Sequence, residues 1–428
     1  MEAMHFHYLS SREGADLTKP FLVGEVKADV WDCDKYKSLG PDDITFGFIK
    51  DFWDILKIDV MRFLVEFHRN RKLANGINST FIALIPKVDN PQRLNDFRLI
   101  SLVGSMYKIL AKVLANRLRL VIGSVISDSQ SAFIKGRQIL DGILMANEVV
   151  DEARKCKKEL LLFKVDFEKV YNSIDWNYLE EVMLKMGFPT LWRKWIKECI
   201  GTATTSVFVN GSPTNEFSLG RGLRQGGPLS PFLFLQVAEG FHVLMEALSV
   251  NNLFIGYQMG SHDPVVVSHL QFAEDTLVLC EKSWANIIAI QAILLLFEDL
   301  SGLKVNFSKS LLVGVNVHGS WLSEDASILN CKVGVTPFMY LGLLIGGNAS
   351  PLDFWEPLIN RINSRLSGWR SRYLSLGGRL ILLKSALSSL PVYALSFFKA
   401  LSCSGASLLN KNSSGASLLK KKTLVLFQ

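Results

Sequence analysis

The sequence predicts an α+β protein in which an antiparallel sheet is backed by helices. Stretches with apolar residues at helical spacing, such as residues 50–68, alternate with short apolar runs of strand type, such as residues 80–87. Two strand-type runs flank the short acidic stretch at residues 272–275, which is typical of a hairpin between antiparallel strands. The chain has 428 residues, which is long for one compact domain, so we expect two or three subdomains.

Composition and charge indicate a globular protein with a polyanionic partner. Hydrophobic residues make up 49% of the chain, which is ample for a large core, and the formal net charge is +7. Residues 61–120 hold eleven Lys and Arg but three acids, so the positive charge is concentrated there. This segment includes a basic amphipathic helix expected at residues 105–122, which by itself favours a solvated helix face over a binding surface.

Cysteine metal sites, disulfides and membrane spans are not expected. The six cysteines are scattered without a Cys-x-x-Cys pair, and the seven histidines add no ligand spacing. No apolar run reaches about 18 residues, so we expect no membrane partner. The first ten residues do not resemble a signal peptide. We therefore expect an intracellular protein, nuclear or cytoplasmic, and the sequence leaves its oligomeric state open.

Helices and strands are expected in mixed order along the chain. Helices are predicted at residues 50–68, 105–122, 138–155, 176–186, 231–248 and 284–300. Strands are predicted at 80–87, 96–102, 160–166, 203–210, 265–270, 276–279 and, as two short strands, within 337–347. Residues 1–27 are weakly patterned. The string SGASLL at 404 recurs at 414, which marks residues 401–428 as a low-complexity tail.

Carboxylates lie at the ends of neighbouring predicted strands. Glu274 and Asp275 are at the tip of the hairpin, and Asp166 ends the apolar run at residues 160–166. Acid pairs in turns are common, so the hairpin alone favours a solvated turn over a metal site. Asp166 changes this interpretation, because carboxylates from two adjacent strands can hold two Mg²⁺ ions for phosphoryl transfer. A glycine-rich loop at residues 220–228, before a helix, could seat an anion.

Five motifs occur in the order found in one known family. They are FRLISL at 97–102, QSAFIKGR at 130–137, DFEKVY at 166–171, RQGGPLSP at 224–231 and FAED at 272–275. Over residues 20–400 the chain thereby resembles reverse transcriptases of non-LTR (LINE-type) retrotransposons, in the form common in plant genomes. The resemblance implies a right-hand polymerase fold with fingers, palm and thumb. The implied division is an N-terminal extension with the start of the fingers at 1–67, the reverse transcriptase domain at 68–346, a thumb-like helical region at 347–400 and the tail at 401–428.

The resemblance also implies roles for individual residues. The catalytic ligands of Mg²⁺ or Mn²⁺ would be Asp166, Glu274 and Asp275. The nucleotide-binding residues would be Lys87, Arg98, Phe167, Tyr171, Gln225 and Gly226. Tyr171 would pack under the incoming sugar, Lys87 and Arg98 would meet the triphosphate, and residues 340–347 would form a primer grip. The implied partners are an RNA template, a DNA primer and deoxynucleoside triphosphates.

Several motif positions depart from the family pattern. Glu274 stands where the family has aspartate, and its extra methylene moves the carboxylate by about 1.5 Å, one carbon–carbon bond. A misplacement of about 1 Å in an active site can lower a rate on the order of a hundredfold. Asn172 and Gly227 stand where aspartate is usual, and Leu99 stands where proline is usual. We therefore expect an impaired, decayed copy without an endonuclease, a cysteine-rich knuckle or a ribonuclease H domain.

Two functions remain open on the sequence alone. The first is an RNA-directed DNA polymerase domain with weak activity or none. The second is a catalytically dead remnant that only binds nucleic acid. The first requires Asp166 to lie near Glu274 and Asp275 on the same side of one sheet.

Overall fold

The computed structural model describes residues 4–36, 38–209, 211–260 and 262–347, together with 355, 356, 360 and 396–398. By its internal contacts the chain forms two compact units, residues 1–142 with 152–334 and residues 143–151 with 335–428. The predicted thumb-like region and the predicted tail lie almost entirely outside the described residues. The predicted elements can therefore be compared with the structure up to residue 347.

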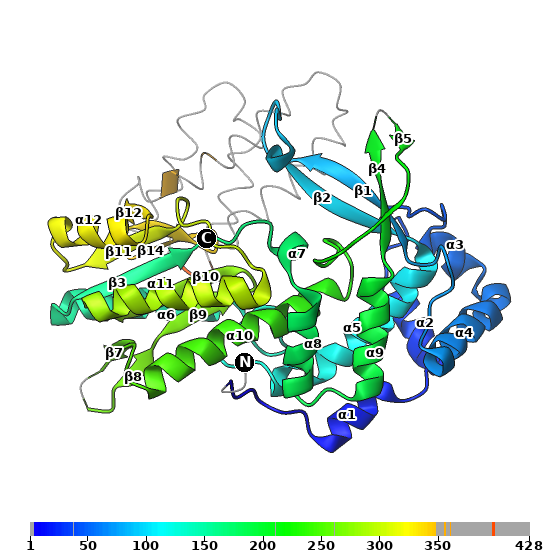
Figure 1. Cartoon of the computed structure of the whole chain (residues 1–428), viewed down its shortest axis with the longest axis horizontal. Helices are drawn as coiled ribbons and strands as arrows, with labels where there is room; N and C mark the ends of the chain where they lie inside the picture. Colours follow the sequence, from blue (N-terminus) through cyan, green and yellow to red (C-terminus); the bar gives the residue numbers. More distant parts are fainter. Residues whose placement is uncertain are drawn as a thin grey trace, which may run out of the picture. The chain divides into compact units, whose positions relative to one another are not determined.

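Helices and strands occur in mixed order along the described chain, which begins with four helices (Figure 1). The helices are α1 Ser11–Thr18, α2 Val23–Trp31, α3 Phe46–Asp51, α4 Trp53–Asn70, α5 Ser105–Val121, α6 Ile139–Cys156, α7 Val170–Ser173, α8 Trp176–Lys185, α9 Thr190–Gly201, α10 Ser230–Val250, α11 Trp284–Ser301 and α12 Gly319–Ile328. The strands are β1 Ser79–Pro86, β2 Phe97–Val103, β3 Leu160–Val165, β4 Thr204–Val209, β5 Ser212–Pro213, β6 Phe217–Ser218, β7 Tyr257–Met259, β8 Val265–Val267, β9 His269–Phe272, β10 Asp275–Glu281, β11 Leu311–Val315, β12 Lys332–Gly334, β13 Phe338–Tyr340 and β14 Leu343–Ile345.

The predicted helices are all present, and the first is divided at Phe52 into α3 and α4. One predicted strand is wrong, because residues 265–270 divide at Ser268 into β8, which pairs with β7, and β9, which pairs with β10. Sequence reasoning missed α1, α2, α7, α9, α12, β6, β7, β11 and β12. Helix α1 had a usable signal, since Ser10 and Glu13 form a capping box at its start.

The sequence predicts an antiparallel sheet around β3 and β10, and the structure extends it to the strand order β12-β11-β3-β10-β9, which we call the palm sheet. All its neighbouring strands run antiparallel except β11 and β12. Helices α10 and α11 back it, as Figure 1 shows. Phe241 of α10 meets His269 of β9 edge-on with ring centroids 5.6 Å apart, and Phe297 of α11 meets Phe167, just after β3, at 6.3 Å. The expected sheet backed by helices is confirmed.

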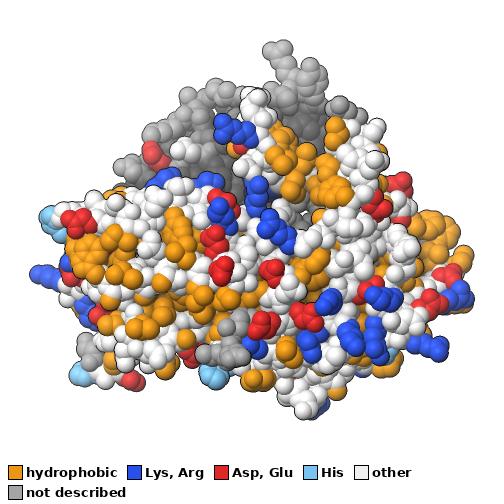
Figure 2. Space-filling model, viewed as in Figure 1, with side chains coloured by type: hydrophobic (Ala, Val, Ile, Leu, Met, Phe, Trp, Pro, Cys, Tyr) orange, Lys and Arg blue, Asp and Glu red, His pale blue; other side chains and the backbone are white. Residues whose placement is uncertain are grey.

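A second sheet, the fingers sheet, has the order β2-β1-β4-β5, with β6 also paired to β4. Strands β1 and β2 are antiparallel partners, as predicted, and Ile85 lies opposite Arg98. Strand β4 runs parallel to β1. Figure 2 shows hydrophobic side chains gathered over β1 and β2, where Ile85 is 47% exposed. In the second unit, β13 and β14 form the predicted short hairpin, with Tyr340 opposite Leu343.

One of the four cations on α5, Arg117, is used inside the protein. Arg117 is 4% exposed and pairs with both oxygens of the Glu25 carboxylate. Its guanidinium also donates to the carbonyls of Leu17, Lys19 and Pro20. A solvated face, which the helix alone favoured, is therefore wrong for Arg117, because this side chain ties the N-terminal segment to α5.

Helices α10 and α11 are long and apolar enough to cross a membrane by composition alone. The most apolar 18-residue window is 67% buried in α10 and 39% buried in α11. Core helices of soluble proteins meet the same criterion, so this composition is weak evidence for a span. The expectation of no membrane span rests on the lack of an unbroken apolar run of about 18 residues, and these two helices reach the mean hydropathy of a span without one.

A buried carboxylate in α12 makes stability depend on pH. Asp325 is fully buried, and neither of its oxygens has a hydrogen-bond partner among the described residues. Burial raises the pKa of Asp325 from 3.8 to about 7; nearby Glu324 adds to this and Lys282 opposes it. The folded chain keeps a proton that the unfolded chain releases near pH 4, so the free energy of unfolding falls as pH rises from about 4 to 7.

We predict that Asp325→Asn removes this pH dependence. At pH 8 its free energy of unfolding should exceed that of the native chain by about 2–4 kcal/mol, since each unit of pKa shift corresponds to about 1.4 kcal/mol. At pH 4 the two should agree within about 0.5 kcal/mol. Urea unfolding at both pH values measures this, with the exposed neighbour substitution Glu324→Gln as the control. Equal stability of the native chain and Asp325→Asn at pH 8 contradicts the account.

We also predict that Arg117→Met lowers the free energy of unfolding by about 3–5 kcal/mol, because it leaves a partly buried carboxylate and three carbonyls without their donor. The matched control is Arg62→Met, which removes an exposed ion pair to Asp59 and should cost less than about 1 kcal/mol. Denaturant unfolding of both variants gives the comparison. Equal losses of unfolding free energy in the two variants would show that the Arg117 contacts stabilise the fold no more than an exposed ion pair does.

Candidate active site

The acidic hairpin is present, with a tight turn at its tip. Phe272 pairs with Asp275 at the ends of β9 and β10, so Ala273 and Glu274 form a two-residue turn. Ala273 has φ of +52°, a left-handed conformation that residues other than glycine rarely adopt. Glu274 is exposed at the tip and Asp275 is half-buried beside it. The turn therefore presents two carboxylates from a constrained backbone.

Asp166 lies across the palm sheet from Asp275. Strands β3 and β10 are antiparallel, and their last pair joins Val165 to Thr276. One residue further along each strand, Asp166 faces Asp275, and cross-strand neighbours of this kind project from the same face of a sheet. The charge of Asp166 acts on Asp275 and helps to raise its pKa. The predicted closeness of these two acids is therefore present.

The main chain of Asp166 is held from the opposite side to β10. Its amide N donates to Ser310 Oγ at 3.0 Å, and its carbonyl accepts from the amide N of Asn306 at 2.7 Å. Sequence reasoning missed both residues. The available signal was the polar string NFSKS at 306–310, which lies between two apolar runs. Asp166 is thus fixed by two neighbouring segments of chain.

Phe167 contributes to this edge through its main chain. Its ring points into the core toward Phe297, and its backbone forms a bridge with Val305. Because side chains alternate along an extended chain, the ring of Phe167 and the carboxylate of Asp166 face opposite ways.

Nearby protein displaces water and raises the pKa of both turn carboxylates, although the Glu274 side chain itself remains exposed. For Glu274 the loss of surrounding water is the largest cause, and the charge of Asp275 adds to it. For Asp275 the loss of water is again the largest cause; Lys164 lowers the pKa and Asp166 raises it. Both carboxylates are disfavoured as anions by their surroundings, so a cation placed between them would be stabilised.

The oxygen atoms of Asp166, Glu274 and Asp275 suit Mg²⁺ or Mn²⁺, which prefer carboxylate and water ligands. Within the part of the chain that the structure describes, no three His, Cys, Asp or Glu side chains already converge as a metal cage. Magnesium sites that act on phosphates use one or two protein carboxylates and complete their shell with waters and substrate oxygens. The donor set therefore fits an open site of that kind.

A cleft of about 560 Å³ opens over the acidic turn. Its wall includes Tyr171, Gln225 and Gly226, which the family resemblance placed near a nucleotide, together with Glu274 and Asp275. Four further lining residues had not been singled out for a role, although they lie in the quoted motifs: Phe133, Pro228, Ser230 and Pro231. The volume is within the usual range for small-molecule sites.

Tyr171 is a neutral hydrogen-bonding group in the cleft. Burial, with the nearby charge of Glu274, raises the pKa of Tyr171 to about 12. Its ring packs against Phe234 with centroids 5.7 Å apart. The chain around it is held close by Gly222, which has φ of +82° and where a Cβ atom would lie 2.8 Å from the backbone of Asn172. Only glycine fits there.

The cleft wall is joined to the fingers sheet at the glycine-rich loop. The amide N of Ser101 on β2 donates to the carbonyl of Gln225 at 2.9 Å, and the Cγ2 atom of Ile100 lies 3.5 Å from where a Cβ of Gly226 would stand. Arg98, two residues before Ile100, projects from the same face of β2. Neither Lys87 nor Arg98 belongs to the described lining of the cleft; both are exposed, and Lys87 Nζ donates to the carbonyl of Asn95 at 3.0 Å.

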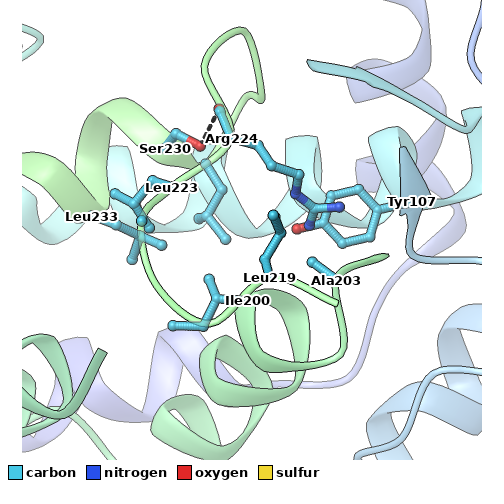
Figure 3. A pocket seen from close by; sticks show the side chains of 10 residues that line it. Tyr107, Ile200, Ala203, Leu219, Leu223, Arg224, Ser230 and Leu233 are labelled. Carbon is cyan, nitrogen blue, oxygen red and sulfur yellow. Dashed lines mark hydrogen bonds between the residues drawn. The ribbon is translucent and has the colours of Figure 1, made fainter. Parts of the chain in front are cut away.

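Arg224, one residue earlier in the same loop, is buried and does not line the cleft. Figure 3 shows its side chain lying against the ring of Tyr107, in a separate pocket. Its guanidinium donates to Asn78 Oδ1 at 2.6 Å and to the Cys199 carbonyl at 2.9 Å. The guanidinium carbon lies 3.9 Å from the centroid of the Tyr107 ring. Arg224 therefore braces the loop against the start of β1 and the end of α9.

Known proteins resemble the chain over this region. A family model described as reverse transcriptase (RNA-dependent DNA polymerase) matches residues 85–345. An uncharacterized 149 kDa protein of transposon TX1 from Xenopus laevis is 27% identical over 393 residues, 90% of this chain and 29% of that protein. A retrovirus-related Pol polyprotein from the type-1 retrotransposable element R2 of Popillia japonica is 25% identical over 279 residues, 63% of this chain and 38% of that protein. The structure of apo telomerase from Candida tropicalis, truncated from its C-terminal domain, aligns with 12% identity and a TM-score of 0.39, over 64% of this chain and 57% of that one.

The chain spans about a third of the length of the two retrotransposon proteins that it matches. The family model covers well over half of the chain, including β2, β3 and the hairpin of β9 and β10. The plant-like form remains a prediction. The chain belongs to the reverse transcriptase family and is of LINE-type retrotransposon origin, and its described residues form the palm and fingers sheets of a right-hand polymerase fold.

Proposed function

We propose that this chain is an RNA-directed DNA polymerase domain that extends a DNA primer on an RNA template by two-metal nucleotidyl transfer. The single observation that carries the proposal is the pairing of β3 with β10, which sets Asp166 opposite Asp275, a residue that lines the cleft. The substrates would be deoxynucleoside triphosphates.

Asp166, Glu274 and Asp275 would hold the cations. Two divalent ions, Mg²⁺ or Mn²⁺, would activate the primer 3′-hydroxyl and neutralise the charge on the transferring phosphates. The chain's own part is to fix the oxygen ligands, Asp166 through Ser310 and Asn306, and Asp275 through its place in β10. Such fixing matters because a catalytic site needs placement within about 0.5 Å.

The cleft wall would receive the nucleotide. Tyr171 would lie under the sugar and leave no room for a 2′-hydroxyl, and the main chain of Phe167 would run beside the triphosphate. Gln225 and Gly226 would border the base and the template, since both line the cleft. Gly226 has φ of +93°, so its backbone can approach a ligand without a side chain in the way.

Cationic side chains would bind the phosphates of the triphosphate and of the template–primer. Arg98 projects from the same face of β2 as Ile100, which contacts the cleft wall, and Lys87 follows the partner strand β1. Both are exposed, so both are accessible to a polyanion. This proposal assigns the nucleic-acid contacts to the fingers sheet, since Arg117 and Arg224 are occupied inside the protein.

Glu274 favours a second candidate function. The family resemblance implies an aspartate at this position, and Glu274 stands at the tip of a two-residue turn, where the backbone has little freedom to absorb an extra methylene. The alternative is a remnant that binds template–primer and performs no chemistry.

We predict that Glu274→Asp raises the primer-extension rate by about tenfold to a hundredfold with Mg²⁺ or Mn²⁺, because it withdraws the carboxylate by a distance on the order of 1 Å. The assay uses an RNA template, a DNA primer and deoxynucleoside triphosphates. The matched control adds Asp166→Asn to Glu274→Asp and should return extension to background.

Equal extension by the native chain and by Glu274→Asp would contradict the predicted impairment. Extension by neither, with template–primer binding intact, would contradict the polymerase proposal and support the binding remnant.

We predict that template–primer binding weakens steeply as salt rises from about 50 to 200 mM, because displaced counterions oppose binding at each neutralised phosphate. Lys87→Ala and Arg98→Ala should each reduce the slope of log K against log salt by about 1. Fluorescence anisotropy measures the slope, and Arg62→Ala, on the exposed side of α4, is the control. A slope near zero for the native chain is incompatible with either candidate function.

A further inference from the structure

Residues 129–131 pair with β9, the strand that leads into the acidic turn. The proposed chemistry does not use this segment. Strand β9 is the last strand of the palm sheet. The amide N of Gln271 on β9 donates to the Ser129 carbonyl at 2.7 Å, and the amide N of Ser131 donates to the Gln271 carbonyl at 3.0 Å. Gln130, between these serines, forms a parallel bridge with Gln271. The segment therefore closes an edge that would otherwise be open.

The side chain of Gln130 reaches past this bridge to the turn itself. Its Oε1 atom accepts from the amide N of Ala273 at 2.8 Å, and its Nε2 atom donates to the carbonyl of Ala273 at 3.3 Å. Oε1 also accepts from the amide N of Ala132 at 3.0 Å. The side chain is 1% exposed. One buried amide thus satisfies both main-chain groups of a single turn residue, and we call this arrangement the Gln130 clamp.

The Gln130 clamp is itself anchored. Arg137 Nη1 donates to the Gln130 carbonyl at 2.6 Å, and Arg137 pairs with Asp128 at 3.1 Å. Glu239 of α10, which is buried, accepts from the amide N and the hydroxyl of Ser127 at 2.9 and 3.1 Å. The glutamine therefore acts from a fixed base connected to the core helix α10.

The clamped residue is the one under strain. Ala273 keeps φ of +52° without being glycine, a conformation that costs of order 1 kcal/mol and persists only where its surroundings impose it. The next residues in the chain are Glu274 and Asp275, so the Ala273 backbone directs Glu274 and, together with the pairing of β10, Asp275. We propose that Gln130 is a positioning residue, whose amide holds the Ala273 backbone so that Glu274 and Asp275 face the cation site across from Asp166; the role of that site rests on the proposed function.

The chemistry of the clamp requires an amide. Two N–H groups converge on one atom of the side chain, which identifies that atom as the oxygen, and the other atom must donate to a carbonyl. Methionine at this position would fill similar space but leave two buried N–H groups and one carbonyl unsatisfied. Asparagine would keep the amide but withdraw it by about 1.5 Å.

The test compares Gln130→Met with Gln236→Met. Gln236 on α10 is fully buried, and its amide atoms have no hydrogen-bond partner among the described residues, so this control makes the same substitution without removing a clamp. Hydrogen exchange at the Ala273 amide, measured by mass spectrometry of fragments covering residues 270–276, reports the clamp without any activity. Gln130→Met should speed this exchange by about tenfold or more, as loss of a buried hydrogen bond does, and Gln236→Met should leave it unchanged.

Mn²⁺ binding, followed by the electron paramagnetic resonance signal of free Mn²⁺, tests the positioning. Gln130→Met should raise the Kd for Mn²⁺ by about fivefold or more, since misplaced outer contacts weaken metal sites by about 10–100-fold, and leave template–primer binding unchanged. Gln236→Met should change neither. If Gln130→Met does not fold, Gln130→Asn provides the same comparison.

Unchanged Ala273 exchange in a folded Gln130 variant would overturn the clamp. Faster exchange with an unchanged Mn²⁺ affinity would overturn the positioning role. Absence of Mn²⁺ binding in both the native chain and Glu274→Asp would refute the proposed function, whereas the exchange result would still decide whether Gln130 holds the turn.

Discussion

The register between β3 and β10 is the constraint on which the site depends. Strand β3 lies inside the palm sheet between β11 and β10, and its residues Leu160, Leu161, Leu162 and Phe163 are fully buried. A slip of one residue would turn every side chain of a strand to the other face and would carry Asp166 away from Asp275. The apolar packing that stabilises the sheet therefore also fixes the positions of the Asp166 and Asp275 carboxylates.

Around this pair of strands, main-chain hydrogen bonds fix what the register leaves free. The segment at 304–310 holds Asp166, the loop at 222–226 holds Tyr171 and the cleft wall, and the segment at 129–131 holds the acidic turn. Two buried arginine side chains also connect separate parts of the chain. Arg224 joins the glycine-rich loop to the fingers sheet, and Arg117 joins the N-terminal segment to α5. The basic character of the chain is thus partly a feature of its core.

The sequence predicted β3 and β10 of the palm sheet, the hairpin and the pairing of acids because those features leave local patterns: apolar runs, a turn and charges at strand ends. It did not predict that Val265 and His269 belong to different strand pairs, since the composition of an apolar run does not determine which strand it pairs with. It could not separate Arg117, which is buried, from Arg98, which is exposed, because a count of charges does not reveal how deeply each side chain is buried. Gln130 and Ser310 were missed as supports because each acts across more than 140 residues of sequence.

The central claim is that Asp166, Glu274 and Asp275 share one cation site on one face of the palm sheet. X-ray diffraction from crystals grown with Mn²⁺, at a wavelength where manganese scatters anomalously, tests this most directly. The account predicts an anomalous peak about 2.0–2.2 Å from carboxylate oxygens of Asp166 and Asp275, close to the Mg²⁺–oxygen distance of about 2.0–2.1 Å. A peak elsewhere with none between these carboxylates, or Asp166 and Asp275 projecting from opposite faces of the sheet, would contradict it.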